Sequence, residues 1–172
     1  MAAIQAVLFD LDGVLIDTEP TWDQVRSEFG ERHGGRWTAE LQQQMMGART
    51  AEWSKALSDA THGAVTPESA AEHVIAQLAT IYRRHLAVIP GAADAVRALA
   101  KEFRLGLVSG SPEVLIRLVL RLAGLADCFE VAMSADDVAR GKPDPDPYVE
   151  LARRLDVATR DSAAVEIGRA HV

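Results

Sequence analysis

Cysteine is nearly absent from this sequence, which contains only Cys128 among its 172 residues. A chain with one cysteine cannot form an intramolecular disulfide, and this cysteine usage suits a reducing compartment. We therefore expect a cytoplasmic protein. No base partner for Cys128 is evident in the sequence, so we expect it to be a small buried apolar residue.

Positive charge and long hydrophobic runs are also scarce. The 18 Lys and Arg residues are outnumbered by 25 Asp and Glu residues, which gives a net charge of −7 at pH 7. That balance excludes a general basic field for nucleic acid, although a local basic pocket for a small phosphate remains open. The N-terminal apolar run is too short for a signal peptide or a membrane span, so no membrane partner is expected.

The sequence does contain a short apolar strand that ends in two acids. Residues 4–10 have a buried-strand pattern, and Asp10 and Asp12 stand at its end, just before Gly13. In an open α/β sheet, paired carboxylates at a strand end could hold a hard cation, attack an electrophile or move a proton. Gly13 permits a sharp turn that exposes backbone N–H groups to an anion. The alternative is an ordinary Asp-Gly hairpin turn.

The next block, residues 17–88, has helical periodicity and no strand pattern. The spacing predicts a helix from Pro20, and Thr38, Thr50 and Thr66 are expected to cap three further helices. We therefore predict an all-helical module inserted after the first strand.

The chain after residue 88 alternates between helix and strand patterns. Strands are predicted at 105–108, 129–133 and 163–166, helices at 92–102, 112–123 and 148–155, and a rigid proline-rich loop at 142–147. This alternation predicts an α/β fold with a parallel sheet and right-handed crossovers. Residues 1–16 and 89–166 would form its core.

The last residues, 167–172, have neither a helix pattern nor a turn pattern. We interpret them as a non-native tail, a sequencing adapter translated after an incomplete gene, which would not be part of the fold. The alternative is a natural frayed terminus. On the first interpretation, the last core strand is missing.

Candidate chemical groups follow successive strands. Asp10 and Asp12 follow the first strand, and Ser109 with the backbone of Gly110 follows the second; Lys142 and Glu166 come after the third and fourth. The carboxyl ends of parallel strands meet at one edge, so these groups can converge. A nucleophile, a proton donor, an N–H cradle and a cation together suit phosphoryl transfer.

Three motifs in this order resemble those of the haloacid dehalogenase-like hydrolases: Asp10-Leu11-Asp12-Gly13-Val14, Ser109-Gly110-Ser111, and Gly141-Lys142-Pro143-x-Pro145-Asp146. The resemblance covers residues 4–166. It is closest to the subgroup with a helical cap, which includes phosphoglycolate phosphatase, β-phosphoglucomutase and sugar-phosphate phosphatases. It implies a Rossmann-like core, a cap at residues 17–88, Mg²⁺ as cofactor and a small phosphorylated metabolite as partner.

The resemblance also implies roles for individual residues. Asp10 would attack phosphorus, and Asp12 would protonate the leaving alcohol and then activate water. Ser109 and the Gly110 amide would bind phosphate oxygens, with further N–H groups near Gly13, and Lys142 would neutralise the nucleophile–phosphate pair. The metal ligands would be Asp10, the Asp12 backbone carbonyl and Glu166.

The family pattern fails at its fourth motif. An acidic pair is expected after the fourth strand, but Glu166 is followed by Ile167. An isoleucine cannot ligate a cation. We therefore expect the complete natural protein to be a phosphatase, and this 172-residue chain to bind Mg²⁺ poorly and to be nearly inactive.

Two cap residues are candidates for substrate contact. Glu19 begins the cap near the first connection to the core, and Arg49 lies in a turn that resembles the segment facing the substrate. Arg49 could also be an ordinary surface arginine. Trp22, Trp53 and the Met45-Met46 pair lie on helical stripes, so we interpret them as cap core rather than as ligand contacts.

The function that fits these features is a Mg²⁺-dependent phosphatase acting on a small phosphomonoester, in particular a sugar phosphate, through an aspartyl-phosphate. A phosphomutase of the β-phosphoglucomutase type and a metal-deficient, non-catalytic binding module remain as alternatives. We expect a monomer or a weak dimer.

Overall fold

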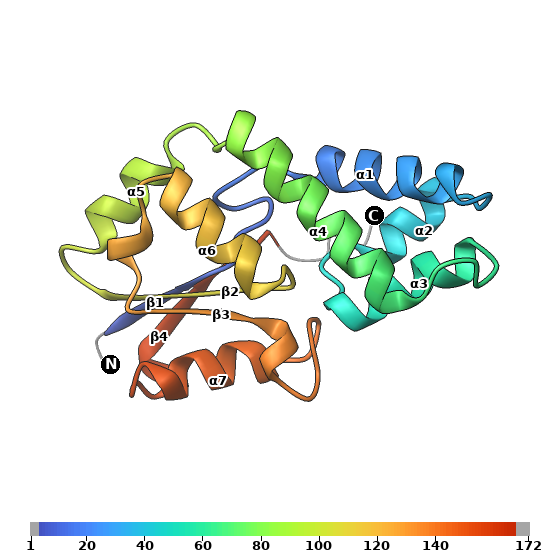
Figure 1. Ribbon diagram of the computed structural model, residues 1–172. Coiled ribbons are helices and arrows are strands. Elements are labelled where there is room, and N and C mark those ends of the chain that lie inside the picture. Colours follow the sequence, from blue (N-terminus) through green and yellow to red (C-terminus); the bar gives the residue numbers. More distant parts are fainter. Residues whose placement is uncertain (1–3, 168–172) are drawn as a thin grey trace.

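The computed structural model describes residues 4–167 and contains a four-stranded parallel sheet. The strands are β1 (Ala6–Phe9), β2 (Arg104–Ser109), β3 (Val131–Ser134) and β4 (Ser162–Val165), in the order β3-β2-β1-β4 (Figure 1). Phe9 of β1 pairs with Leu107 of β2 and with Val165 of β4. The predicted α/β fold with a parallel sheet is confirmed, and the strand bounds differ from the predicted ones by one or two residues.

Three helices cover the two faces of the sheet. Figure 1 shows α5 (Ala92–Leu99) and α6 (Glu113–Leu122) on one face and α7 (Asp146–Arg154) on the other. Single 3₁₀ turns lie at Ala126–Cys128, Ala135–Asp137 and Thr159–Asp161. The predicted loop 142–147 is too long, because α7 already begins at Asp146. Pro147 is tolerated there, since the first helical turn has no partner for its N–H groups.

Alternation along β1 divides the core between the two faces. Ala6 and Leu8 belong to a smaller apolar cluster with Leu151 of α7 and Leu155, which directly follows α7. The intervening residues of β1 face the larger cluster, which includes α6 and continues into the helices of residues 17–88. Cys128 was expected to be buried, but it is only half-buried against this larger cluster.

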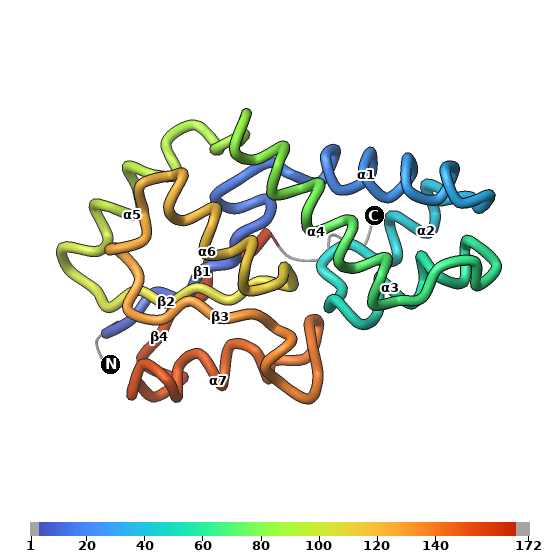
Figure 2. Tube along the Cα trace, in the orientation of Figure 1, coloured from blue at the N-terminus to red at the C-terminus, as the bar shows by residue number. Residues whose placement is uncertain are grey.

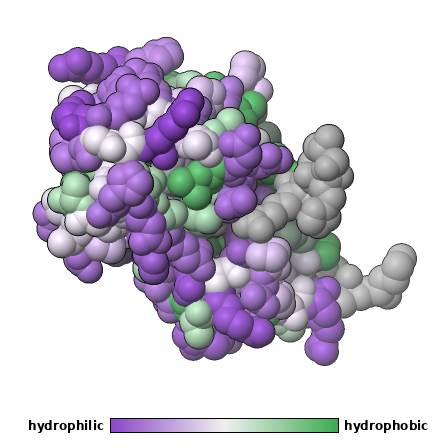
Figure 3. Space-filling model, turned by 90° about the vertical axis from the view of Figure 1, so that its right-hand side faces the viewer, coloured by the Kyte–Doolittle hydropathy of each residue, from purple (hydrophilic) through white to green (hydrophobic). Residues whose placement is uncertain are grey.

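Residues 17–88, called the cap from here on, contain α1 (Glu19–Arg32), α2 (Ala39–Met45), α3 (Thr50–Ala60) and α4 (Pro67–Arg84). Figure 1 shows these helices on one side of the core, and Figure 2 traces the chain leaving the core after β1 and returning after α4. From the cap side, most of the surface is hydrophilic around a smaller hydrophobic area (Figure 3).

Two of the three predicted threonine caps are confirmed. The side chain of Thr38 accepts a hydrogen bond from Leu41 N, and that of Thr66 accepts one from Ser69 N. The third prediction is wrong, because Thr50 is the first residue of α3. Its hydroxyl donates to a carboxylate of the core, as described next.

The cap is docked on the segment that follows β3. Asp136 Oδ1 accepts a hydrogen bond from Thr50 N at 2.9 Å, and Asp136 Oδ2 accepts one from Thr50 Oγ1 at 2.6 Å. Arg49 Nη1 donates to the carbonyls of Val138 and Ala139 at 3.1 and 2.9 Å. A core carboxylate thus satisfies the first free N–H of a cap helix, at its positive dipole end.

The two connections between cap and core lie side by side. Ile16 and Val88 form an antiparallel bridge, and the amide of Asp17 donates to Ala87 O at 2.8 Å. The domain division at 16/17 and 88/89 stays a prediction, as does the interpretation of the tail. Of residues 167–172, all but Ile167 lie outside the described residues. Between residues 4 and 167, no helix is both long and apolar enough to cross a membrane.

Replacing Leu107 by Ala removes buried volume from a central strand. Leu107 has 0% exposure and lies between Phe9 and Ala132 of the neighbouring strands. The free energy of unfolding is expected to fall by about 2–5 kcal/mol. The control is Val114→Ala on the exposed face of α6, expected to change this free energy by less than about 0.5 kcal/mol. Urea unfolding measures both, and equal effects would contradict the position of the core.

Candidate active site

One cavity of about 550 Å³ lies between the carboxyl edge of the sheet and the cap. It brings together eight of the nine predicted site residues: Asp10, Asp12, Gly13, Glu19, Ser109, Gly110, Lys142 and Glu166. The ninth, Arg49, does not line it. This convergence follows from the parallel sheet, whose strands all end at the same edge.

Lys142 joins two carboxylates that follow different strands. Its Nζ lies 2.8 Å from Asp10 Oδ1 and 2.8 Å from Glu166 Oε2, and it also lies 5.0 Å from the ring centroid of Tyr148. The Tyr148 hydroxyl donates to the same Glu166 oxygen. Sequence reasoning missed Tyr148, because nothing in the pattern of α7 distinguishes it from a core aromatic residue.

The pKa values of these two acids shift in opposite directions. Burial raises the pKa of Asp10 to about 7, with Lys142 working against the increase and the nearby acids adding to it. Burial also raises the pKa of Glu166, but the hydrogen bonds from Lys142 and Tyr148 outweigh it, so that the pKa of Glu166 falls below its usual value. The ammonium group therefore offsets a crowding of negative charge.

Asp12 is held by three hydroxyl groups. Thr18 Oγ1 donates to Asp12 Oδ1 at 2.6 Å, and Ser109 Oγ and Ser111 Oγ both donate to Oδ2 at 2.9 Å. The sequence predicted Ser109 but missed the side-chain roles of Thr18 and Ser111. Ser111 belongs to the second motif and Thr18 follows the first by four residues, but the sequence does not show that their hydroxyls reach Asp12. Asp12 is therefore oriented through both of its carboxylate oxygens.

Two glycines are required at this edge for different reasons. A Cβ on Gly110 would lie 2.6 Å from the carbonyl oxygen of Gly47, so only glycine permits this approach between core and cap. Gly13 has φ +78°, and a Cβ there would lie 2.8 Å from Cδ1 of Ile167. Both glycines line the cavity.

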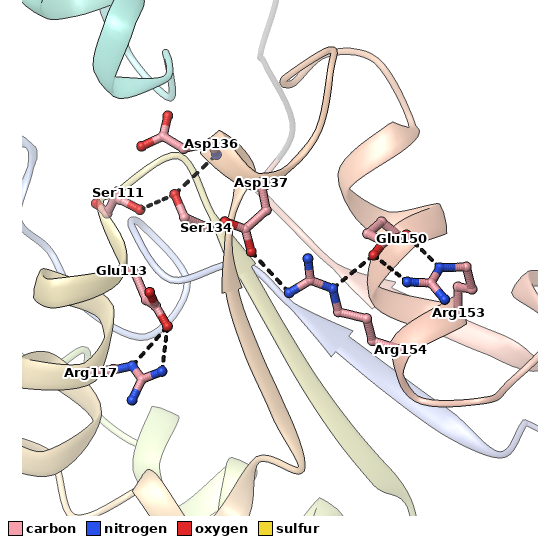
Figure 4. Close-up of polar contacts among 9 residues, drawn as sticks. All are labelled: Ser111, Glu113, Arg117, Ser134, Asp136, Asp137, Glu150, Arg153 and Arg154. Carbon is pink, nitrogen blue, oxygen red and sulfur yellow. Dashed lines mark hydrogen bonds and ion pairs between the residues drawn. The ribbon is translucent and has the colours of Figure 1, made fainter.

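The loops after β2 and β3 are tied together below the cavity. Ser134 Oγ donates to the carbonyl of Ser111 at 2.8 Å and accepts a hydrogen bond from Asp136 N at 3.1 Å (Figure 4). Figure 4 also shows Arg154 of α7 bound to Asp137. The loop that carries Ser111 is therefore supported by the same segment on which the cap docks.

The residues predicted to bind Mg²⁺ fit such an ion poorly. Mg²⁺ requires several oxygen ligands in near-octahedral geometry. Asp12 was predicted to contribute its backbone carbonyl, and the carboxylates of Asp10 and Glu166 are both paired with Lys142. Within residues 4–167, no cluster of three or more His, Cys, Asp or Glu side chains could hold a metal ion. Ile167 lines the cavity with an aliphatic side chain that offers no ligand.

The two predicted cap contacts have different surroundings. Glu19 lines the cavity, and its Oε1 accepts a hydrogen bond from Gln42 Nε2. Burial raises the pKa of Glu19. Arg49 instead binds the backbone of residues 138 and 139 and pairs with Glu52 at 3.2 Å. In this arrangement its guanidinium holds the cap to the core, and its contact with substrate stays a prediction.

Aromatic residues of the cap line the same cavity. Trp22 and Trp53 are 5% and 1% exposed and belong to the large apolar cluster, as expected for cap core. Both nevertheless line the cavity, together with Arg26. The sequence did not predict that these residues also line the cavity. An apolar stripe indicates that a helix face is buried, but it does not show what lies against that face.

Comparisons with known proteins agree with this geometry. A family model for haloacid dehalogenase-like hydrolases matches residues 4–166. The phosphorylated carbohydrates phosphatase of Thermotoga maritima is 29% identical over 170 residues, which cover 98% of this chain and 79% of that protein. Hexitol phosphatase B of Escherichia coli K12 is 30% identical over 179 residues, with 95% and 75% covered.

Solved structures show the same fold. The β-phosphoglucomutase of Clostridium difficile superposes with a TM-score of 0.81, covering 95% of this chain and 76% of that chain at 20% identity. At that identity the likeness is one of fold alone. The family match spans nearly all described residues and includes the three motifs in the cavity. This chain belongs to the haloacid dehalogenase-like hydrolases.

Proposed function

We propose that this protein is a phosphatase that hydrolyses a small phosphomonoester, in particular a sugar phosphate, through an aspartyl-phosphate on Asp10. The contact between Asp10 and Lys142, at the end of β1 and inside the cavity, carries this proposal. A carboxylate that attacks a phosphate dianion meets like-charge repulsion, which a nearby ammonium group reduces. Relatives named as phosphatases of phosphorylated carbohydrates and of hexitols support the substrate class.

The proposed reaction has two steps. An Asp10 oxygen attacks phosphorus, the bond from phosphorus to the ester oxygen breaks, and Asp12 donates its proton to the leaving alkoxide. Asp12 then takes a proton from water, whose oxygen attacks phosphorus and releases phosphate and the Asp10 carboxylate. Ser109, the Gly110 amide, the N–H groups near Gly13 and Lys142 would bind the phosphate oxygens in both steps.

The hydroxyl groups around Asp12 suit it both as a proton donor and as a proton acceptor. An ionised carboxylate accepts hydrogen bonds from Thr18, Ser109 and Ser111, and hydroxyl groups can turn when the acid becomes protonated. These three side chains would keep Asp12 pointed at the leaving-group oxygen and then at water. Positioning of this kind supplies part of the rate enhancement.

Mg²⁺ is the cofactor that the family resemblance implies, and no step above depends on it because the described ligand set fits it poorly. Ile167, which offers no ligand, is one reason for the poor fit. We retain the expectation that this chain binds Mg²⁺ weakly and turns over slowly. The same residue favours the second candidate, a binding module that has kept the fold without the metal. Turnover by the protein separates the two candidates.

Replacing Ile167 by Asp adds a carboxylate beside the cavity, where an isoleucine now stands. Hydrolysis of p-nitrophenyl phosphate is expected to rise at least about tenfold and to become dependent on Mg²⁺. The matched control Ile167→Asn introduces a side chain of similar size to aspartate but without its charge. It should raise the rate of hydrolysis less than Ile167→Asp does. If the Mg²⁺ dependence of the aspartate variant equals that of the unchanged chain, Ile167 is not the missing ligand position.

Replacing Asp10 by Asn removes the proposed nucleophile while keeping its shape. In the Ile167→Asp background, turnover is expected to fall at least roughly 10³-fold, with the circular dichroism spectrum unchanged. The exposed Asp94→Asn variant in α5 controls for loss of a carboxylate and should keep its turnover. Mass spectrometry of the acid-quenched reaction should find the phosphoryl group on Asp10. Retained turnover in Asp10→Asn would rule out this nucleophile.

A further inference from the structure

The cap wall of the cavity contains an arginine enclosed by tryptophans. Arg26 of α1 is 4% exposed and lines the cavity. Its guanidinium carbon lies 4.4 Å from the ring centroid of Trp22, 5.1 Å from that of Trp53 and 5.4 Å from that of Trp37. Such distances are within the range of cation–π attraction, so the rings hold the guanidinium in place.

The enclosure leaves hydrogen-bond donors unused. Arg26 Nη1 donates to Gln42 Oε1 at 3.3 Å, whereas Arg26 Nε has no hydrogen-bond partner among the described residues. Trp53 Nε1 is buried without a partner there as well. Aromatic faces attract the charge but accept hydrogen bonds poorly, and an unpaired buried donor is costly. A wall with spare donors beside an open cavity is typical of a ligand site.

The charge of Arg26 is already balanced. Gln42 accepts from Arg26 and donates to Glu19, so it bridges the guanidinium and a carboxylate on the same wall. Trp37 Nε1 also donates to Gln42 Oε1 at 2.8 Å and fixes the orientation of its amide. Helix α1 therefore presents one positive and one negative group to the cavity.

The rest of the cavity has no spare positive charge. Among the described lining residues, Arg26 and Lys142 are the only cations. Lys142 is already paired with two carboxylates. The acids that line the cavity number five: Asp10, Asp12, Asp17, Glu19 and Glu166. A leaving group with a carboxylate or a second phosphate would meet net repulsion here.

We propose that Trp22, Arg26 and Trp53 bind the leaving group and select a neutral polyhydroxylated one, a sugar or sugar alcohol, over one that carries a carboxylate or a second phosphate. The C–H faces of a polyol pack on indole rings. Its hydroxyl groups accept hydrogen bonds from the guanidinium and donate to Glu19. The inference rests on the proposed function, because the leaving group is the alcohol that the phosphatase releases.

Binding to the full chain tests the selection without requiring turnover. Calorimetric titrations at one fixed Mg²⁺ concentration would compare glucitol 6-phosphate, 2-phosphoglycolate, fructose 1,6-bisphosphate and inorganic phosphate. Glucitol 6-phosphate is expected to bind at least about tenfold more tightly than the two competitors whose leaving groups carry a carboxylate or a second phosphate. The chain has three tryptophans, two of which line the cavity. Their fluorescence should therefore change with glucitol 6-phosphate and not with inorganic phosphate.

Replacing Glu19 by Gln separates recognition from a structural role. The amide keeps the size of the side chain and leaves the charge of Arg26 uncompensated. The preference for glucitol 6-phosphate over 2-phosphoglycolate is expected to fall about tenfold. The control is Glu31→Gln, an exposed position on the same helix, which should keep the preference. A purely structural role for Glu19 would change the thermal midpoint but not the ratio of the two affinities.

A second variant covers the case in which Glu19→Gln fails to fold. Arg26→Lys keeps the charge but loses the planar set of donors, so the affinity for glucitol 6-phosphate should fall about tenfold while that for inorganic phosphate holds. Equal binding of esters with a neutral leaving group and esters with a further carboxylate or phosphate would overturn the selection and leave the phosphatase proposal standing. So would unchanged tryptophan fluorescence with glucitol 6-phosphate. Failure of every phosphate compound to bind would overturn both.

Discussion

Lys142 places one ammonium group between two carboxylates at the carboxyl edge of the sheet. Its Nζ lies 2.8 Å from both Asp10 Oδ1 and Glu166 Oε2. Without that cation, acids from the ends of β1 and β4 would face each other inside a partly closed cavity, where repulsion is stronger than in water. The same edge is where a phosphate ester would add further negative charge.

The cap is part of the site because its position is fixed by contacts with the core. Asp136 receives the first N–H and the hydroxyl of Thr50, and Gly110 is approached closely by the carbonyl of Gly47. A side chain at Gly110 would separate the two parts. The cavity wall made by Trp22 and Trp53 therefore stands at a set distance from the sheet edge, which gives the cap a defined surface to present to a leaving group.

The features predicted correctly depend on residues close together in the chain. Thr38 and Thr66 cap their helices because a threonine side chain reaches the N–H three residues ahead. Thr50 was assigned wrongly because its partner, Asp136, is 86 positions away. Of the site residues, Asp10, Ser109 and Lys142 were found from motifs and strand ends. Tyr148 was not, because its contact with Glu166 depends on how α7 packs against the sheet.

The sequence by itself determined the alternation of strands and helices, the all-helical insertion and the acids, hydroxyls and lysine that meet at one sheet edge. These follow from periodicity and from the rule that parallel strands end at the same edge. Only the tertiary structure decided that Arg49 holds the cap to the core and that Arg26 stands among tryptophans on the cavity wall. Helical periodicity identifies a covered face, but packing against a neighbouring helix and lining a cavity leave the same pattern in the chain.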